Sequence, residues 1–437
     1  MATKQLAATG VLFTDRRDFY ISPNVVKEKW ASVAPFLTVV AAQRTVSGFA
    51  DPVYKMFQHT NPWETQKFSN NGSTDTIPKD NTESAAISID GITGLVATVD
   101  DSYEGLLVEV WDKDEVTFKG AAIITDAVSG TTIKLKSMRN ATIVLVDNDV
   151  FIVYGNARGE GTESPEPWAD ELTIVYNSAQ IMRTPLAITG TLMEAALRGE
   201  RSELIRLRLQ KSAESKFQAE MSMLRGYGTI GTNLGESDTF TDATGANAQW
   251  RTDGSGAKIR ATTGAIAALR EYGNTDVTDV NQNHFEINKG LFTQSDFNAL
   301  SQKAFNIVPG SGVKEMFCGA SMMTYWSNLT AAKKDSWEIN ISDMKRDRLG
   351  FNFKWLDTPN GIFKLINTPA LRGLYAGYGL VISKENMFHA IYRPPEFRAA
   401  ILSKSSSNAP DMVKDEYFRD EGIGMTNLSF HQLLRLV

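Results

Sequence analysis

Cysteine is nearly absent from this chain of 437 residues, which contains only Cys318. One cysteine excludes a disulfide framework within the chain, and this usage fits a reducing compartment. No run of 18 or more apolar residues occurs, and residues 1–30 carry Arg16, Arg17 and Asp18 where a signal peptide would need an apolar core. The sequence therefore predicts neither export nor a membrane span, and synthesis and assembly in a cytoplasm are expected.

An excess of basic residues is also lacking, because the formal net charge is -6 at pH 7. Proteins dedicated to nucleic-acid binding usually carry a basic stripe that neutralises phosphates. The charge argues against such a role, although nucleic acid can be a neighbour without being a ligand.

Catalytic and metal-binding motifs are missing as well. The four histidines lie far apart in the sequence, at His59, His284, His389 and His431. No H-E-x-x-H pattern, phosphate-binding loop or G-x-S-x-G elbow occurs. Residues 226–231 match G-x-G-x-x-G, but they follow a helical pattern and open no helix, so they are interpreted as a helix end entering a loop. Cys318 has apolar neighbours, which favours an inert, buried thiol. No enzyme activity, cofactor or metal is predicted.

Acidic residues cluster in three places. These are Asp112, Asp114 and Glu115; Asp147 and Asp149; and Asp415, Glu416, Asp420 and Glu421. None has the spacing of a calcium loop. Solvated turns are the preferred interpretation.

Residues 191–225 form the most informative segment that is present. The stretch is charged, lacks proline and contains one glycine, Gly199, and it runs from a Thr191-x-x-Glu194 capping pattern to Gly226. A continuous helix of this length would measure about 50 Å. The apolar residues expected to pack are Leu204, Leu207, Phe217, Met221 and Leu224.

The apolar stripe of this helix changes face along its length. Leu204 and Leu207 fall on one side, whereas Phe217, Met221 and Leu224 fall nearly opposite at about 100° per residue. Either the helix breaks at Gly199 or its halves pack against different partners. A long core helix of one large domain and a spine shared with neighbouring chains both remain open.

The N-terminal half of the chain divides into an arm, a loop and a β-rich segment. Residues 1–48 are expected to be an arm with a short helix that begins near Pro23 and is interrupted at Pro35. Residues 49–95, which contain several turn signals, are expected to form an extended loop. Short β-branched runs in residues 96–160 predict a small all-β module of sandwich or barrel type.

The C-terminal half predicts a mixed domain. Residues 161–225 would carry a strand and the long helix. Residues 226–385 contain helical patterns at 261–272, 294–307 and 321–333 among apolar runs, and residues 386–437 read as strands. Because helices and strands are segregated rather than alternating, the expected class is α+β.

This order of parts resembles the major capsid proteins of tailed bacteriophages, which have the Hong Kong 97 type fold. Residues 177–181 with 189–191 are similar to the family's lead-in to its spine helix, and residues 220–226 to the helix exit. Residues 361–371 and 380–395, with Arg393-Pro394, resemble paired strands of the later domain. The β-rich segment before the long helix resembles the insertion that one branch of the family carries.

The resemblance implies a subunit that forms hexamers and pentamers of an icosahedral head around double-stranded DNA, with a portal and scaffolding or decoration proteins as further partners. The loop would contact neighbouring subunits through its large apolar residues, namely Tyr54, Phe57, Trp63 and Phe68. The arm would do so through Arg16, Arg17, Phe19 and Tyr20. Lys55, Lys67 and Lys79 lie on the loop, but no partner for a covalent cross-link is identifiable, and none is predicted.

Three alternatives stay open at this point. An encapsulin-type compartment has the same fold and would enclose cargo protein in place of DNA. A tail or adaptor protein of a virion would form rings or tubes. An enzyme would need a convergent polar pocket with perturbed titratable groups.

Overall fold

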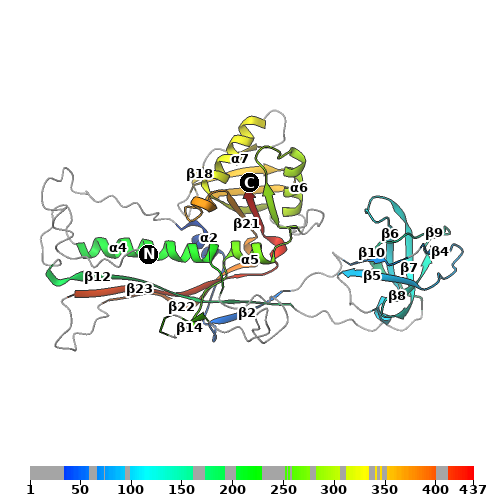
Figure 1. Cartoon of the computed structure of the whole chain (residues 1–437), viewed down its shortest axis with the longest axis horizontal. Helices are drawn as coiled ribbons and strands as arrows, with labels where there is room; N and C mark the ends of the chain where they lie inside the picture. The colour runs from blue at the N-terminus through cyan, green and yellow to red at the C-terminus, as the bar shows by residue number, and fades with distance from the viewer. Residues whose placement is uncertain are drawn as a thin grey trace. The chain divides into compact units, whose positions relative to one another are not determined.

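The protein forms two compact units, one of residues Met1–Gln58 with Thr173–Val437 and one of residues His59–Leu172. We call the first the body and the second the barrel unit (Figure 1). The computed structural model describes residues 34–58, 66–72, 74–93, 99–160, 173–191, 203–228, 251–252, 254–255, 258–275, 282–305, 312–333, 340–341, 345–346, 352–399 and 412–437. Each unit has a hydrophobic core of its own.

The expected α+β class is confirmed by five described α-helices that accompany many strands. The helices are α2 (Pro35–Gln43), α4 (Glu203–Arg225), α5 (Ala265–Tyr272), α6 (Gln294–Phe305) and α7 (Ala320–Lys333). In the described part of the chain, no helix is both long and apolar enough to cross a membrane.

A closed barrel forms the barrel unit. Its strands, in hydrogen-bonding order, are β10 (Val150–Asn156), β3 (Lys67–Asn70), β5 (Ile87–Thr93), β8 (Thr132–Ser137), β7 (Phe118–Ser129) and β6 (Leu106–Trp111), and β4 (Thr76–Ile77) pairs with β9 (Ile143–Val144) beside it. Burial alternates along β6, so every second side chain points into the core. Because the barrel is closed, its six strands leave no open sheet edge.

The boundary between loop and β module at residue 95 is wrong. Strands β3 and β5, which lie within the expected extended loop, belong to the barrel. Phe68 is 1% exposed and stacks on Phe151 at 5.0 Å between ring centroids. Short runs between turn signals look like a loop in sequence, because β3 pairs with β10 about eighty residues further along and β5 pairs with β8 about forty-five residues further along.

Strands β2 (Val53–Gln58) and β11 (Thr173–Ser178) pair antiparallel in the body. Their register joins Gln58 to Thr173, so the chain leaves for the barrel unit and returns from it at adjacent positions. Tyr54, Met56 and Val175 pack with Ala390 in a small core beneath this hairpin.

A four-stranded sheet carries the helix α4. Its order is β1 (Thr45–Ser47), β22 (Met387–Arg398), β23 (Met412–Met425) and β12 (Gln180–Thr189). Ten residue pairs join β12 to β23, which makes a long two-stranded platform. Figure 1 shows α4 running along this platform.

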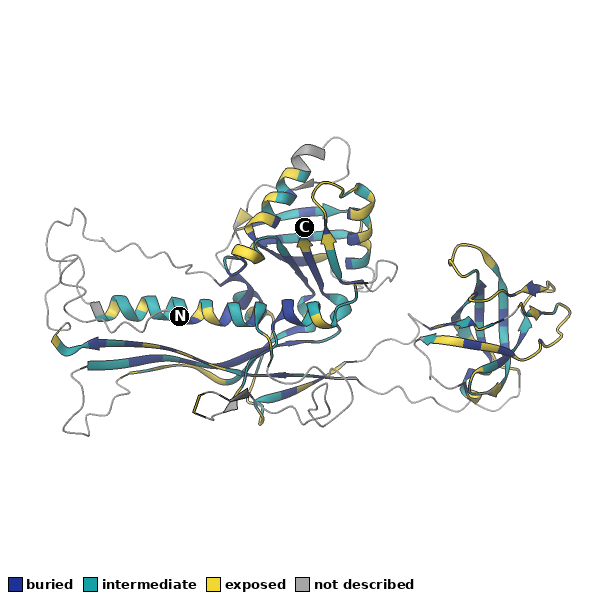
Figure 2. Cartoon of the chain, viewed as in Figure 1, coloured by how far each residue is buried: buried dark blue, intermediate teal, exposed yellow. Residues whose placement is uncertain are grey.

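The body also contains an eight-stranded sheet. Its path is β15 (His284–Ile287), β24 (Gln432–Leu436), β21 (Tyr378–Ile382), β16 (Val313–Cys318), β20 (Gly361–Asn367), β19 (Asn352–Thr358) and β17 (Asn340–Ile341), with β18 (Lys345–Arg346) on β19. Helices α6 and α7 pack on one face through Phe297 and Trp326. Helices α2, α4 and α5 pack on the other face, where Phe317 is buried. The central strands are therefore buried on both sides (Figure 2).

Two further expectations are corrected in the body. The expected boundary at residue 385 is wrong, because it separates β24 from the domain of residues 226–385. Strand β24 lies between β15 and β21 in the same sheet. The N-terminal helix was expected to break at Pro35, but Pro35 is instead the first residue of α2, where its missing N–H costs nothing. Residues 1–33 lie outside the described part.

The three expected helices of the later domain are confirmed as α5, α6 and α7. The long helix ends at Arg225, immediately before Gly226, as its C-terminal signal predicts. The described part of this helix spans about 35 Å at 1.5 Å per residue. Gly199 and the question of a break there lie outside the described residues.

Candidate assembly surfaces

Ion pairs between α4 and β23 hold the long helix on its platform. Arg208 Nε and Nη2 lie 2.9 and 2.7 Å from Asp415 Oδ2, and Tyr417 Oη donates to the Arg208 carbonyl at 3.0 Å. About two turns further along α4, Ser215 Oγ accepts a hydrogen bond from Arg419 Nε of β23. The odd-numbered side chains of β23 therefore face α4, which fixes how the helix lies on the sheet.

The acidic run at 415–421 is not a set of solvated turns, as the sequence pattern suggested. Asp415, Asp420 and Glu421 are fully buried within strand β23. His389 Nε2 lies 3.1 Å and Arg419 Nη1 2.9 Å from the Glu421 carboxylate. Burial acts to raise the pKa of Glu421, but the His389 hydrogen bond and the Arg419 charge outweigh it and lower the pKa. Charges at this position are tolerated because each has a partner.

Glu220 joins α4 to the N-terminus of α2. Its side chain is fully buried, and the Leu37 N–H donates to Oε2 at 3.4 Å. Burial raises the pKa of Glu220 to about 8, although hydrogen bonds from the Leu37 and Phe36 N–H groups oppose the shift. The carboxyl group satisfies N–H groups that a helix leaves open in its first turn.

The two halves of α4 differ in burial. Met223 and Leu224 are buried in the core, and Phe217 and Met221 pack against it. Leu204 and Leu207 are half-buried, and all the fully buried side chains of the described helix lie from Ser215 onward. Ile205 and Leu209 are 58% and 69% exposed, one turn apart on the same side. The first half of the helix thus presents an apolar pair to the outside of the subunit.

The face of the platform that points away from α4 carries a layer of arginines, which we call the arginine face. Its even-numbered β23 positions centre on Phe418, whose ring lies under three guanidinium groups at 4.0 to 5.7 Å, those of Arg398, Arg393 and Arg183. Asp420 is buried beneath and accepts from Arg393 and Arg260. Asp420 and Glu416 lie inside, Glu396 is exposed and pairs with Arg398 at 3.0 Å, and Arg183 and Arg393 reach the surface.

The loop residues that were expected to contact neighbouring subunits lie in different environments, and two of them, Tyr54 and Phe57, lie on opposite sides of β2. Tyr54 is buried, and its hydroxyl donates to the Ile423 carbonyl at 2.7 Å, so it serves the subunit's own core. Phe57 is 60% exposed on the opposite side of the strand. Phe68 lies inside the barrel, which removes it from any subunit contact. Trp63 and the arm residues Arg16, Arg17, Phe19 and Tyr20 lie outside the described residues.

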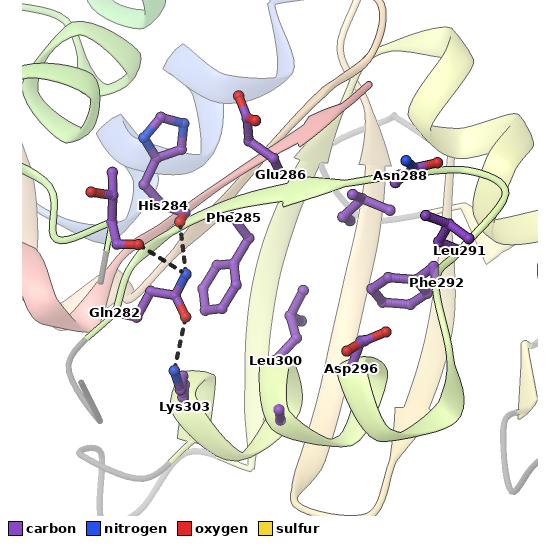
Figure 3. A pocket seen from close by; sticks show the side chains of 13 residues that line it. Gln282, His284, Phe285, Glu286, Asn288, Leu291, Phe292, Asp296, Leu300 and Lys303 are labelled. Carbon is purple, nitrogen blue, oxygen red and sulfur yellow. Dashed lines mark hydrogen bonds between the residues drawn. The ribbon is translucent and has the colours of Figure 1, made fainter. Parts of the chain in front are cut away.

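A groove of about 690 Å³ opens between β15 and α6 at the edge of the eight-stranded sheet (Figure 3). Phe285, Leu291 and Phe292 line it, and Lys303 Nζ donates to Gln282 Oε1 at 2.8 Å across one end. This lining is mostly apolar and holds no nucleophile beside a base. It resembles a packing surface more than an active site.

Buried ionisable groups elsewhere in the sheet are structural. Lys314 Nζ donates to the Phe430 carbonyl at 2.8 Å, and burial lowers its pKa to about 8. Burial and the Lys314 charge lower the pKa of His431 to about 3, and its Nδ1 accepts the Ser383 N–H. Burial raises the pKa of Cys318, which agrees with the expected inert thiol. Within the ranges that the structure describes, no three histidine, cysteine or acidic side chains gather as a metal site.

Comparison with known proteins identifies the chain's family. A family model described as the SU10 major capsid protein matches residues 35–413. The chain belongs to the SU10 major capsid protein family. It is a structural subunit of a phage head, and copies of it assemble into the capsid shell of the virion.

Solved structures of low similarity accompany this family match. A chain of the structure titled Microbacterium phage Oxtober96 is 8% identical, with 98% of this chain and 99% of that chain covered at a TM-score of 0.41. A chain from the capsid of Myoviridae phage XM1 is 7% identical, with 96% of this chain and 97% of that chain covered at a TM-score of 0.41. The SrpI encapsulin of Synechococcus elongatus PCC 7942 is 9% identical, with 63% and 76% covered at 0.36. These likenesses are too distant to support a conclusion, and no curated protein matches.

Family membership favours the phage head over the encapsulin, tail and enzyme alternatives. The role that it implies for the major capsid protein is structural rather than catalytic. Part of this arrangement was indicated by the sequence, since the apolar face changes along the long helix and different partners for its two halves were one of two interpretations left open. The buried ion pairs of β23 gave no such signal.

Proposed function

We propose that the protein builds hexamers and pentamers that close into an icosahedral head around double-stranded DNA. The observation that carries the proposal is the burial pattern of α4. Its second half is packed in the subunit core, while Ile205 and Leu209 in its first half have no apolar cover within the described chain. Exposed apolar pairs of this kind favour a protein neighbour.

Phe57 supplies the matching apolar group on the β2–β11 hairpin. In this proposal Phe57 of one copy packs near the Ile205–Leu209 pair of the next copy. A contact between two different patches is heterologous, and such contacts close into rings when the rotation fits. The exposures of Phe57, Ile205 and Leu209 support this arrangement.

The arm and the first part of the loop join the same network in the proposal. Arg16, Arg17, Phe19, Tyr20 and Trp63 would become ordered against neighbours during assembly, so that buried interface offsets the lost chain entropy. Deletion of residues 1–20, or Trp63→Ala, is expected to leave soluble subunits that form few shells.

Further partners follow from the proposed role. A portal would occupy one vertex, scaffolding or decoration proteins would guide or coat the shell, and assembly would take place in the cytoplasm of a bacterial host. DNA would be a confined neighbour rather than a specific ligand, because the formal net charge of -6 gives little adhesion to phosphates.

Imaging of the purified protein by electron microscopy tests the proposal. Wild-type protein is expected to form closed particles. Ile205→Asp/Leu209→Asp should give folded subunits without particles, because a buried carboxylate pair would oppose the contact. Ile205→Leu/Leu209→Met keeps the surface apolar and should assemble normally. Normal particles from the aspartate variant would contradict the assigned surface, and tubes or rings from the wild type would contradict the head.

A further inference from the structure

Charge is segregated between the two units. The barrel unit, residues 59–172, contains 8 basic and 20 acidic residues, which gives a net charge of -12. The body contains the remaining 37 basic and 31 acidic residues, which gives +6. The overall value of -6 therefore hides two units of opposite sign, and such units attract one another over about 8 to 10 Å at physiological salt.

An aromatic and acidic patch marks one end of the barrel. Trp111 ends β6 and packs edge to face with Phe118 at 5.4 Å between ring centroids. Phe118 is 52% exposed, although a buried position would be usual for phenylalanine. Trp111 Nε1 donates to Glu109 Oε2 at 3.0 Å, and Asp114 is exposed in the turn that joins the two strands. Aromatic rings beside carboxylates are suited to guanidinium groups.

The arginine face of the body offers the complementary chemistry. Arg183 is exposed beside Phe418, and Arg393 and Arg398 keep part of their guanidinium groups at the surface. Lys414 lies on the same side, because side chains alternate along β23. The helix α4 covers the other face of this sheet, and on the arginine face the Arg183 and Arg393 side chains are exposed.

We propose that the barrel unit of one copy docks on the arginine face of a neighbouring copy, with the Trp111–Phe118 patch at the contact. This inference rests on the proposed shell. In a symmetric shell each copy supplies one acidic barrel and one basic face, so every barrel finds a partner of the opposite charge. Charge complementarity would also guide the approach and fix the pairing.

Zero-length cross-linking of mixed-isotope particles tests the docking. Light and ¹⁵N-labelled subunits are assembled together, treated with a carbodiimide, and digested for mass spectrometry. We expect heavy–light peptides that join barrel carboxylates, such as Asp114, to Lys414. Cross-links only within one isotope would show that the barrel docks on its own body, and would overturn the inference.

A pair of charge variants sharpens the test. Asp114→Lys should reduce the heavy–light cross-links that join the remaining barrel carboxylates, such as the exposed Glu115, to Lys414 by about tenfold, and Arg183→Glu should do the same. Combining the two should restore a large part of the yield. The matched control is Asp101→Lys, which changes the charge of the barrel unit by the same amount. Asp101 lies just before the first residue of β6, whereas Trp111 is the last residue of that strand. Equal losses from Asp101→Lys and Asp114→Lys would contradict the placement of the contact.

The outcomes separate the inference from the proposed function. Closed wild-type particles without barrel-to-body cross-links between copies contradict the docking alone. Failure of the wild-type protein to form particles contradicts the shell itself, and the docking with it.

Discussion

Glu220 is the residue whose charge state matters most to the fold. It is buried in the core with Oε2 3.4 Å from the Leu37 nitrogen in the first turn of α2, and its pKa is raised to about 8. A carboxyl whose pKa is higher in the folded state than in the unfolded state favours folding in its protonated form. Its contribution is therefore fully present below pH about 4.5 and falls as the pH rises towards 8.

Glu220→Gln is expected to remove this pH dependence. The glutamine carbonyl can still accept from the Leu37 N–H, whereas no charge has to be buried at high pH. At pH 9 the variant should be more stable than the wild type by on the order of 4 kcal/mol, and the difference should shrink at pH 5. Urea unfolding of unassembled subunits at both pH values measures this. Parallel pH profiles for the two proteins would contradict it.

Arg208 tests the buried ion pairs of β23. Arg208→Ala removes two charged donors from the buried Asp415 and is expected to destabilise the subunit by about 2 to 4 kcal/mol. Arg208→Ala/Asp415→Asn should recover part of the loss, because the uncompensated charge is gone. Chemical unfolding measures both. A loss below 0.5 kcal/mol for the single variant would place this pair among ordinary surface ion pairs.

At the scale of the element, α4 performs two separate tasks along its length. Met223→Ala creates a cavity in the core and should destabilise the subunit by about 2 to 4 kcal/mol. Ile205→Ala should change subunit stability by less than about 0.5 kcal/mol, yet reduce particle yield. Thermal unfolding and particle counts from the same preparations separate these effects. Equal destabilisation by both changes would contradict the division of the helix.

Elements also differ in how far their residues predict them. Helices α5, α6 and α7 follow local periodicity and were predicted close to their observed bounds. Strands β3 and β5 were missed, because a strand of four to seven residues depends on partners remote in sequence. Phe68 shows the effect at one position, since its burial depends on Phe151 rather than on its immediate neighbours.

At the scale of the whole molecule, the barrel unit is expected to be separable from the body. Gln58 and Thr173 are register partners, so a short Gly-Asn turn in place of residues 59–172 would close the β2–β11 hairpin. The shortened protein should keep the thermal midpoint of the body to within about 4 °C, because the barrel has its own core. Calorimetry measures this midpoint, and loss of a cooperative transition would contradict the separation.

The sequence by itself determined the properties that depend on local pattern and composition. These are the α+β class, the long helix ending before Gly226, the three helices of the later domain and the inert character expected of Cys318. Only the tertiary structure decided which charges are buried and which aromatic residues face outward. Asp420 and Asp114 look alike in sequence, but one lies under arginines from distant strands and the other lies in an exposed turn. Burial of a charge depends on partners that the fold alone brings together, and local pattern carries no record of them.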